Sequence, residues 1–204
     1  GCRAITMPEL PYMQGLPSYQ SDYWDPFFQT VSDEGVVVCL HIGMGLDAIN
    51  MGPDFSPDNY MVLATQVTVL AVQDLLWGPA FRKFPDLKVA FSEGGIGWIP
   101  FLLEGLDYEV SETAPHIGEI LSMKPSEYFK RQVYVCYWFE QASMRGVLDQ
   151  IGADRVLFET DFPHPTCLYP SPLAVVEDKI AALRPETQRK VMGDTAIALY
   201  RLAD

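Results

Sequence analysis

The chain has 204 residues, of which 49% are hydrophobic and 20% charged, a composition that suits a folded domain and excludes an intrinsically disordered one. Its formal net charge of −13 argues against nucleic-acid and anionic-membrane partners, because both require an excess of Lys and Arg. The 4 cysteines are scattered and form no C-x-x-C or zinc-finger pattern. No apolar run approaches the roughly 18 residues of a membrane span. We therefore expect a cytoplasmic protein with reduced cysteines.

Short apolar segments alternate with helical segments along the chain. Strands are predicted at residues 2–7, 36–41, 87–93, 133–138 and 156–158. Helices are predicted at 22–35, 56–84 with a break at Gly78-Pro79, 98–110, 125–131, 141–150, 171–183 and 185–202. The proline-containing stretches 9–21 and 115–125 predict loops. This alternation indicates an α/β fold with a parallel sheet.

Two architectures fit such a sheet. A doubly wound nucleotide-binding domain should carry a glycine-rich phosphate loop after its first strand. Here Pro8-Glu-Leu-Pro11 follows that strand, and neither G-x-G-x-x-G nor G-x-x-x-x-G-K occurs. A (β/α)8 barrel is therefore favoured, and because it needs eight strands, residues 1–204 are expected to form one incomplete TIM-barrel domain, about strands four to eight. The opening at Gly1, without an initiator Met, favours the same interpretation.

Three of the predicted strands lead into a polar side chain. His41 ends the second, Glu93 ends the third before Gly94-Gly95, and Asp161 closely follows the fifth. Because the carboxyl ends of parallel barrel strands meet at one mouth, we expect these side chains to lie together. Imidazole and carboxylate are ligands of Zn²⁺ and related ions, which activate water or polarise a substrate oxygen. The alternative is that His41 is structural and that the two acids cap turns.

Two further side chains are candidates for substrate contact. His164 shares a proline-bounded loop with Asp161, so it either faces the mouth or occupies a surface turn. Trp98, just beyond Gly94-Gly95, either lines a pocket or packs in the core. His116, in the predicted loop 115–125, is interpreted as structural or peripheral.

Three motifs together resemble the amidohydrolase-related family, which includes decarboxylases of aminocarboxymuconate semialdehyde and γ-resorcylate. They are Leu40-His-Ile-Gly43, Phe84-Pro-Asp-Leu-Lys-Val-Ala-Phe-Ser-Glu-Gly-Gly95 and Phe158-Glu-Thr-Asp-Phe-Pro-His164. The resemblance extends from Trp24-Asp-Pro26 to Gly193-Asp-Thr-Ala-Ile-Ala-Leu-Tyr200. It implies a distorted (β/α)8 barrel with one divalent metal at its mouth, bound by His41 after the fifth strand and Asp161 after the eighth.

The sequence departs from this family at two points. Glu93 stands where the decarboxylases carry a histidine that handles the proton, although a glutamate can serve as general acid or base if its pKa is raised. The family's first strand supplies two more metal ligands in an H-x-H or E-x-H pattern, and this chain contains neither pattern. The resemblance therefore implies that the chain is the carboxyl-terminal part of a longer enzyme and is inactive when isolated.

Two hypotheses for function follow. In the first, the parent protein is a metal-dependent hydrolase or carboxy-lyase that acts on a small carboxylate or cyclic substrate. Asp161 and Glu93 are then catalytic, with zinc as the first expectation for the metal and manganese as the alternative. In the second, the protein has lost its chemistry and binds a small molecule or a partner, which the Glu93 departure would explain. A homo-oligomer is compatible with either hypothesis.

Overall fold

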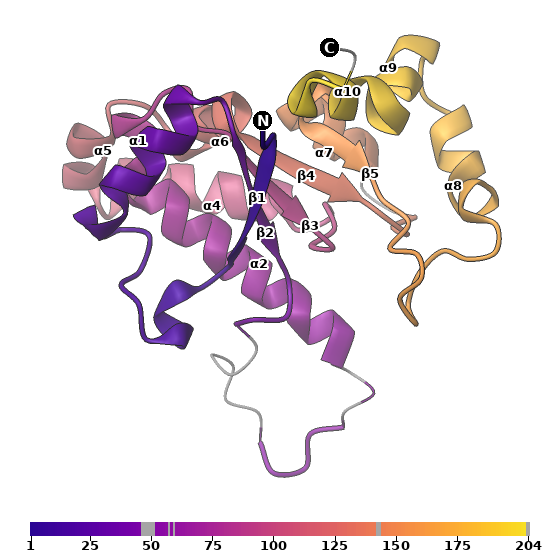
Figure 1. The fold of residues 1–204 in the computed structure, drawn as a ribbon, viewed down its shortest axis with the longest axis horizontal. Helices are drawn as coiled ribbons and strands as arrows, with labels where there is room; N and C mark the ends of the chain where they lie inside the picture. Colours follow the sequence, from indigo (N-terminus) through magenta and orange to yellow (C-terminus); the bar gives the residue numbers. More distant parts are fainter. Residues whose placement is uncertain (46–51, 57, 59, 142–143, 203–204) are drawn as a thin grey trace.

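Five parallel strands form one sheet in the computed structural model, which describes residues 1–45, 52–56, 58, 60–141 and 144–202 (Figure 1). The strands follow one another across the sheet in chain order, from β1 to β5. They are β1 (Ala4–Pro8), β2 (Val37–His41), β3 (Val89–Ser92), β4 (Val133–Tyr137) and β5 (Val156–Phe158). The predicted α/β fold and parallel sheet are confirmed.

Ten α-helices accompany this sheet over the described ranges. They are α1 (Asp25–Asp33), α2 (Tyr60–Trp77), α3 (Ala80–Lys83), α4 (Ile99–Glu112), α5 (Pro115–Leu121), α6 (Pro125–Gln132), α7 (Met144–Ile151), α8 (Pro172–Ala181), α9 (Pro185–Arg189) and α10 (Thr195–Tyr200). Six of them, α1, α4, α5, α6, α8 and α9, carry a proline in the first turn, where its missing N–H costs no hydrogen bond. Among the described residues, no helix is long and apolar enough to cross a membrane.

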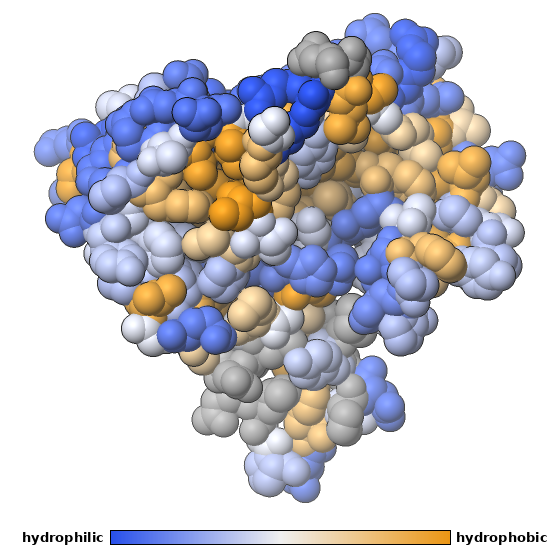
Figure 2. All heavy atoms as spheres, in the orientation of Figure 1, coloured by the Kyte–Doolittle hydropathy of each residue, from blue (hydrophilic) through white to orange (hydrophobic). Residues whose placement is uncertain are grey.

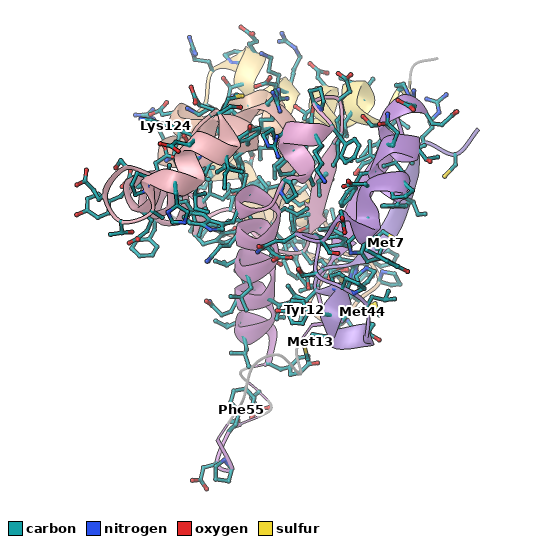
Figure 3. All side chains as sticks on the ribbon, turned by 90° about the vertical axis from the view of Figure 1, so that its left-hand side faces the viewer. Met7, Tyr12, Met13, Met44, Phe55 and Lys124 are labelled. Carbon is teal, nitrogen blue, oxygen red and sulfur yellow. The ribbon has the colours of Figure 1, made fainter. Side chains whose placement is uncertain are left out.

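Some predicted boundaries were wrong. The loop prediction at 115–125 weighed Pro115 as a breaker, whereas this proline begins helix α5. The break at Gly78-Pro79 is confirmed, because α2 ends just before it and α3 begins just after it. The predicted start at Ser56-Pro57 partly lies outside the described residues, and α2 begins at Tyr60. Figure 3 shows Phe55 far from the body of the molecule, in the connection that leads to α2.

The two faces of the sheet are packed differently. On the outer face, Val38, Phe91 and Val135 belong to the main core with the helices that cover that side. On the inner face, a smaller cluster joins Val37, Ala90, Tyr134, Cys136 and Leu157 to Leu199 of α10. This alternation follows the period of two along each strand. Figure 2 shows hydrophobic side chains at the surface beside β1, one edge of the described sheet.

Gln132 ties helix α6 to the segment before β3. Its side chain is buried, and its amide donates to the carbonyl oxygens of Phe84 at 2.8 Å and Leu87 at 3.1 Å. We expect Gln132→Ala to lower the free energy of unfolding by about 2 kcal/mol, because two buried carbonyls lose their donor. Urea denaturation measures this. The control Gln29→Ala removes an exposed contact to Asp33 and should cost under about 0.5 kcal/mol; equal losses for both variants would contradict the interpretation.

Candidate active site

Four of the predicted residues lie together at the carboxyl edge of the sheet. The Nε2 atom of His41, at the end of β2, is 2.7 Å from Oε1 of Glu93, which directly follows β3. Asp161, beyond β5, lies close enough to Glu93 to raise its pKa. His164 completes the row, with Nδ1 3.1 Å from Oδ2 of Asp161. The structure thus brings together side chains that are up to 123 positions apart in the sequence, counted from 41 to 164.

The two catalytic candidates, Glu93 and Asp161, have a backbone conformation that residues other than glycine rarely adopt. The φ angles of Glu93 and Asp161 are 61° and 57°, in the left-handed region that glycine favours. Such residues cost about 1–3 kcal/mol each and concentrate at functional sites. The backbone N–H of Glu93 donates to both carboxylate oxygens of Glu159, at 2.9 and 3.0 Å. Glu159 therefore holds Glu93 in place.

The two glycines after Glu93 are required by close contacts. A Cβ atom at Gly94 would lie 2.6 Å from Cγ2 of Thr68, and one at Gly95 would lie 2.5 Å from Oε1 of Glu140. Gly95 also has a φ of 64°. The turn that presents Glu93 is thus packed from two sides and leaves room for glycine only.

The imidazole of His41 has a defined tautomer. Its Nδ1 lies 2.7 Å from the backbone carbonyl of Ile42, which can only accept, so Nδ1 carries a proton and donates it. Nε2 lies 2.7 Å from Oε1 of Glu93 and is the nitrogen that can accept a proton, or bind a metal in place of that contact. Burial alone lowers the pKa of His41, but the Ile42 carbonyl and Glu93 outweigh it and raise the pKa.

The pKa of Glu93 is raised as well. Burial is the main cause, Asp161 adds to it through its negative charge, and His41 opposes both. Oδ2 of Asp161 is buried and forms no hydrogen bond among the described residues, although His164 lies near it. The Glu93 carboxyl group, whose pKa is raised, lies beside this Asp161 oxygen and is therefore able to hold and transfer a proton.

Two further acids of this site, the buried Glu9 and the half-buried Glu159, were not predicted from the sequence. Glu9 follows β1 directly, is fully buried, and accepts a hydrogen bond from Thr68 at 2.7 Å. Burial raises its pKa to about 7, and burial likewise raises that of Glu159 to about 7. The signal for Glu9 was present, since it also follows a strand, but the loop prediction for 9–21 hid it. In the run Glu159-Thr160-Asp161, the sequence predicts a role for the last residue only.

The remaining predicted histidine and tryptophan take different places. The indole N–H of Trp98 donates to the carbonyl of Gly94 at 2.9 Å, so its ring supports the glycine turn. Trp98 also lines a cavity of about 230 Å³ that Glu93 and Trp138 line too. His116 is exposed on α5.

The donor set of this chain suits a divalent metal only in part. His41 supplies an imidazole nitrogen with a fixed tautomer, and Asp161 supplies a buried oxygen to which no described residue donates a hydrogen bond. Within the part of the chain that the structure describes, no three His, Cys, Asp or Glu side chains form a metal-binding group by themselves. The two residues therefore fit as part of a metal site and need further ligands to complete it.

Glu9 should make stability fall as the pH rises. Its ordinary pKa is 4.5 and its folded-state pKa is about 7, so between these values the unfolded chain releases a proton that the folded chain keeps. The destabilisation of the folded state by Glu9 is absent below pH 4.5 and complete above pH 7. We expect Glu9→Gln to reduce the loss of unfolding free energy between pH 5 and pH 8 by about 2–3 kcal/mol. Denaturation at both pH values measures it, and an unchanged loss would contradict the assignment to Glu9.

Comparison with known proteins gives the family. The family model described as amidohydrolase matches residues 9–202. A curated 2-amino-3-carboxymuconate-6-semialdehyde decarboxylase from Dictyostelium discoideum is 22% identical over 178 residues, which are 87% of this chain and 48% of that protein. The chain thus spans about half the length of the curated relative that it matches.

Solved structures show the same fold. An amidohydrolase from Mycobacterium avium subsp. paratuberculosis superposes with a TM-score of 0.83 at 22% identity, over 98% of this chain and 51% of that one. A dihydroxybenzoic acid decarboxylase from Polaromonas, solved with manganese and the inhibitor 2-nitroresorcinol, gives 0.70 at 22% identity, over 91% and 56%. The five strands are thus part of a TIM barrel of the amidohydrolase type, as the sequence predicted. Because the family model matches nearly all of the sequence, the chain belongs to the amidohydrolase family.

Proposed function

We propose that the protein carrying this chain is a metal-dependent carboxy-lyase or hydrolase that acts on a small carboxylate or cyclic substrate. The observation that carries the proposal is the row His41, Glu93 and Asp161 at the strand ends, with a buried Asp161 oxygen that has no hydrogen bond from any described residue. The names of the two decarboxylase relatives favour the carboxy-lyase reaction and an aromatic or unsaturated acid as substrate.

His41 and Asp161 are the residues of this chain that would hold the metal. The imidazole would bind through Nε2 and the aspartate through its carboxylate, and other parts of the protein would supply the remaining ligands. The metal, zinc or manganese, would polarise a substrate oxygen or lower the pKa of water. Manganese is supported by the Polaromonas structure.

Glu93 would handle the proton. In a decarboxylation the carbon–carbon bond breaks, its electron pair stays on the substrate carbon, and a proton must replace the departing CO₂. The raised pKa of Glu93 suits the donor of that proton, and the carboxylate left behind is then reprotonated from solvent. In a hydrolysis, Asp161 would instead take a proton from the attacking water. The two hydrogen bonds from the backbone N–H of Glu93 to the Glu159 carboxylate fix the position of Glu93 at the carboxyl edge of the sheet.

A catalytically lapsed member that only binds a ligand is the second candidate. The 2.7 Å contact between Nε2 of His41 and Oε1 of Glu93 favours it, because a histidine that already has a carboxyl partner needs no metal to satisfy that nitrogen. Metal content and turnover separate the two candidates.

The metal should depend on two side chains. We expect the full-length protein to contain about one equivalent of zinc or manganese, measured by elemental analysis, and we expect His41→Ala and Asp161→Ala to lose most of it. The control His116→Ala changes an exposed histidine on α5 and should keep the metal. A metal-free parent that takes up neither Zn²⁺ nor Mn²⁺ would exclude the metal-dependent reaction and leave the binding module.

The proton-transfer role of Glu93 is tested separately. Glu93→Gln keeps the size of the side chain but cannot donate or accept the proton, so we expect CO₂ release from dihydroxybenzoates to fall at least about 100-fold while the metal content stays unchanged. The assay is release of CO₂ over a panel of hydroxylated benzoates. Full activity in Glu93→Gln would remove this residue from the chemistry, and loss of metal would reassign it as a ligand.

A further inference from the structure

A cavity of about 510 Å³, here called the α2–α4 cavity, lies between helix α2, helix α4 and the short turn Pro11–Gln14. Its volume is in the range of small-molecule sites. Figure 3 shows Tyr12, on the turn, next to helix α2. No Lys, Arg or His, and none of the active-site candidates, is among the described residues that line this cavity. Its wall combines two aromatic rings, two aliphatic side chains and two carboxylates, which belong to Tyr12, Trp77, Leu70, Leu106, Asp74 and Glu109.

The electrostatic potential in the α2–α4 cavity is negative for two reasons. Asp74 and Trp77 belong to the last turn of α2, the end of a helix at which backbone carbonyl groups carry partial negative charge. This turn contains no basic residue to balance that charge. The carboxylates of Asp74 and of the exposed Glu109 on α4 add two full charges. A cation in the cavity is therefore attracted from α2 and from α4, and an anion is repelled.

The carboxylate of Asp74 is held in place by the protein itself. Its Oδ1 accepts a hydrogen bond from the side-chain amide of Gln20 at 2.7 Å, and its Oδ2 accepts one from the backbone N–H of Tyr19 at 3.2 Å. Burial raises the pKa of Asp74, and these two bonds oppose the rise. The charge of Asp74 acts on the cavity wall, because it adds to burial in raising the pKa of Tyr12. A positively charged ligand would thus stabilise a carboxylate that burial destabilises.

The rest of the wall indicates which kind of cation fits. Tyr12 is 43% exposed and Trp77 is half-buried, so both side chains have surface to offer beside the two carboxylates. An alkylated ammonium group is attracted to aromatic rings, and it loses few hydrogen bonds when it leaves water. A hard metal ion instead requires six or more oxygen ligands, which this largely apolar wall does not supply.

We propose that the α2–α4 cavity binds a small organic cation that carries an alkylated ammonium group. Asp74 and Glu109 attract its charge, and the aromatic side chains of Tyr12 and Trp77 contact its alkyl groups. Leu70 and Leu106 provide apolar surface for the remainder of the molecule. The binding site is separate from the carboxyl edge of the sheet, so it requires neither the metal nor the reaction proposed for that edge.

A pair of ligands with the same shape tests the charge directly. Choline and 3,3-dimethylbutan-1-ol differ only in that a neutral carbon replaces the quaternary nitrogen. Calorimetry with the full-length protein at constant ionic strength should show choline binding about tenfold more tightly, from its attraction to the aromatic rings and the carboxylates. Equal affinities, tighter binding of the alcohol, or no detectable binding of choline would overturn the proposal.

Two pairs of variants locate the binding to this cavity. Asp74→Asn should weaken choline binding about threefold and leave the alcohol unaffected, whereas Asp33→Asn should change neither affinity. Asp33 is a matched control, because it also accepts a hydrogen bond from a glutamine side chain but lies on α1, outside the cavity. Trp77→Leu should weaken choline binding several-fold, and Trp77→Phe, which keeps an aromatic ring, should restore most of it. Unchanged choline binding in both Asp74→Asn and Trp77→Leu would exclude this cavity as the site.

The salt dependence of binding covers the case in which a variant fails to fold. In the unmodified protein, added NaCl should weaken choline binding several-fold, because ions screen the attraction to the exposed Glu109, and should not weaken binding of the alcohol. A preference for choline that salt leaves unchanged would contradict the electrostatic basis of the proposal. Neither measurement needs metal or turnover. A failed metal assay together with positive choline binding would therefore reject the proposed function and retain the α2–α4 cavity as a cation site.

Discussion

The parallel register of β1 to β5 is the constraint on which the candidate site depends. Pro8 pairs with His41, His41 pairs with Ser92, and Tyr137 pairs with Phe158, so the strands end at nearly the same level. Each connecting segment must therefore leave the sheet from the same edge, and the first polar residue after a strand enters a shared space. A shift of one residue in any strand would turn its inner side chains outward and disperse the site.

The shared space holds more negative than positive charge. Glu9, Glu93, Glu159 and Asp161 gather at the strand ends, and each of the three glutamates has a raised pKa for which burial is the largest cause. His41 and His164 are the imidazoles that contact two of these acids. Carboxyl groups crowded in a low dielectric either keep protons or attract a cation. Burial thus lets the carboxyl groups of Glu9 and Glu159, each with a pKa of about 7, keep protons close to neutral pH.

Sequence reasoning recovered the sheet and the centre of the site because both follow from strong local signals. Apolar runs that stop at His41, Glu93 and Asp161 mark buried parallel strands, and the edge where they meet follows from topology. Glu9 was missed because two prolines near it, at 8 and 11, indicated only a loop. The role of Glu159 depends on the long-range hydrogen bonds that it accepts from the backbone N–H of Glu93, which no local pattern predicts. Helix α5 was missed because a proline both ends and begins helices.

The most direct test is a crystal structure of the full-length protein grown with Mn²⁺ and measured at the manganese absorption edge. If the strand ends form a metal site, one anomalous peak lies about 2.2 Å from both Nε2 of His41 and a carboxylate oxygen of Asp161. Glu93 then remains close by without binding the ion. A map without a peak at this edge of the sheet, with His41 still paired to Glu93, would contradict the metal-dependent chemistry.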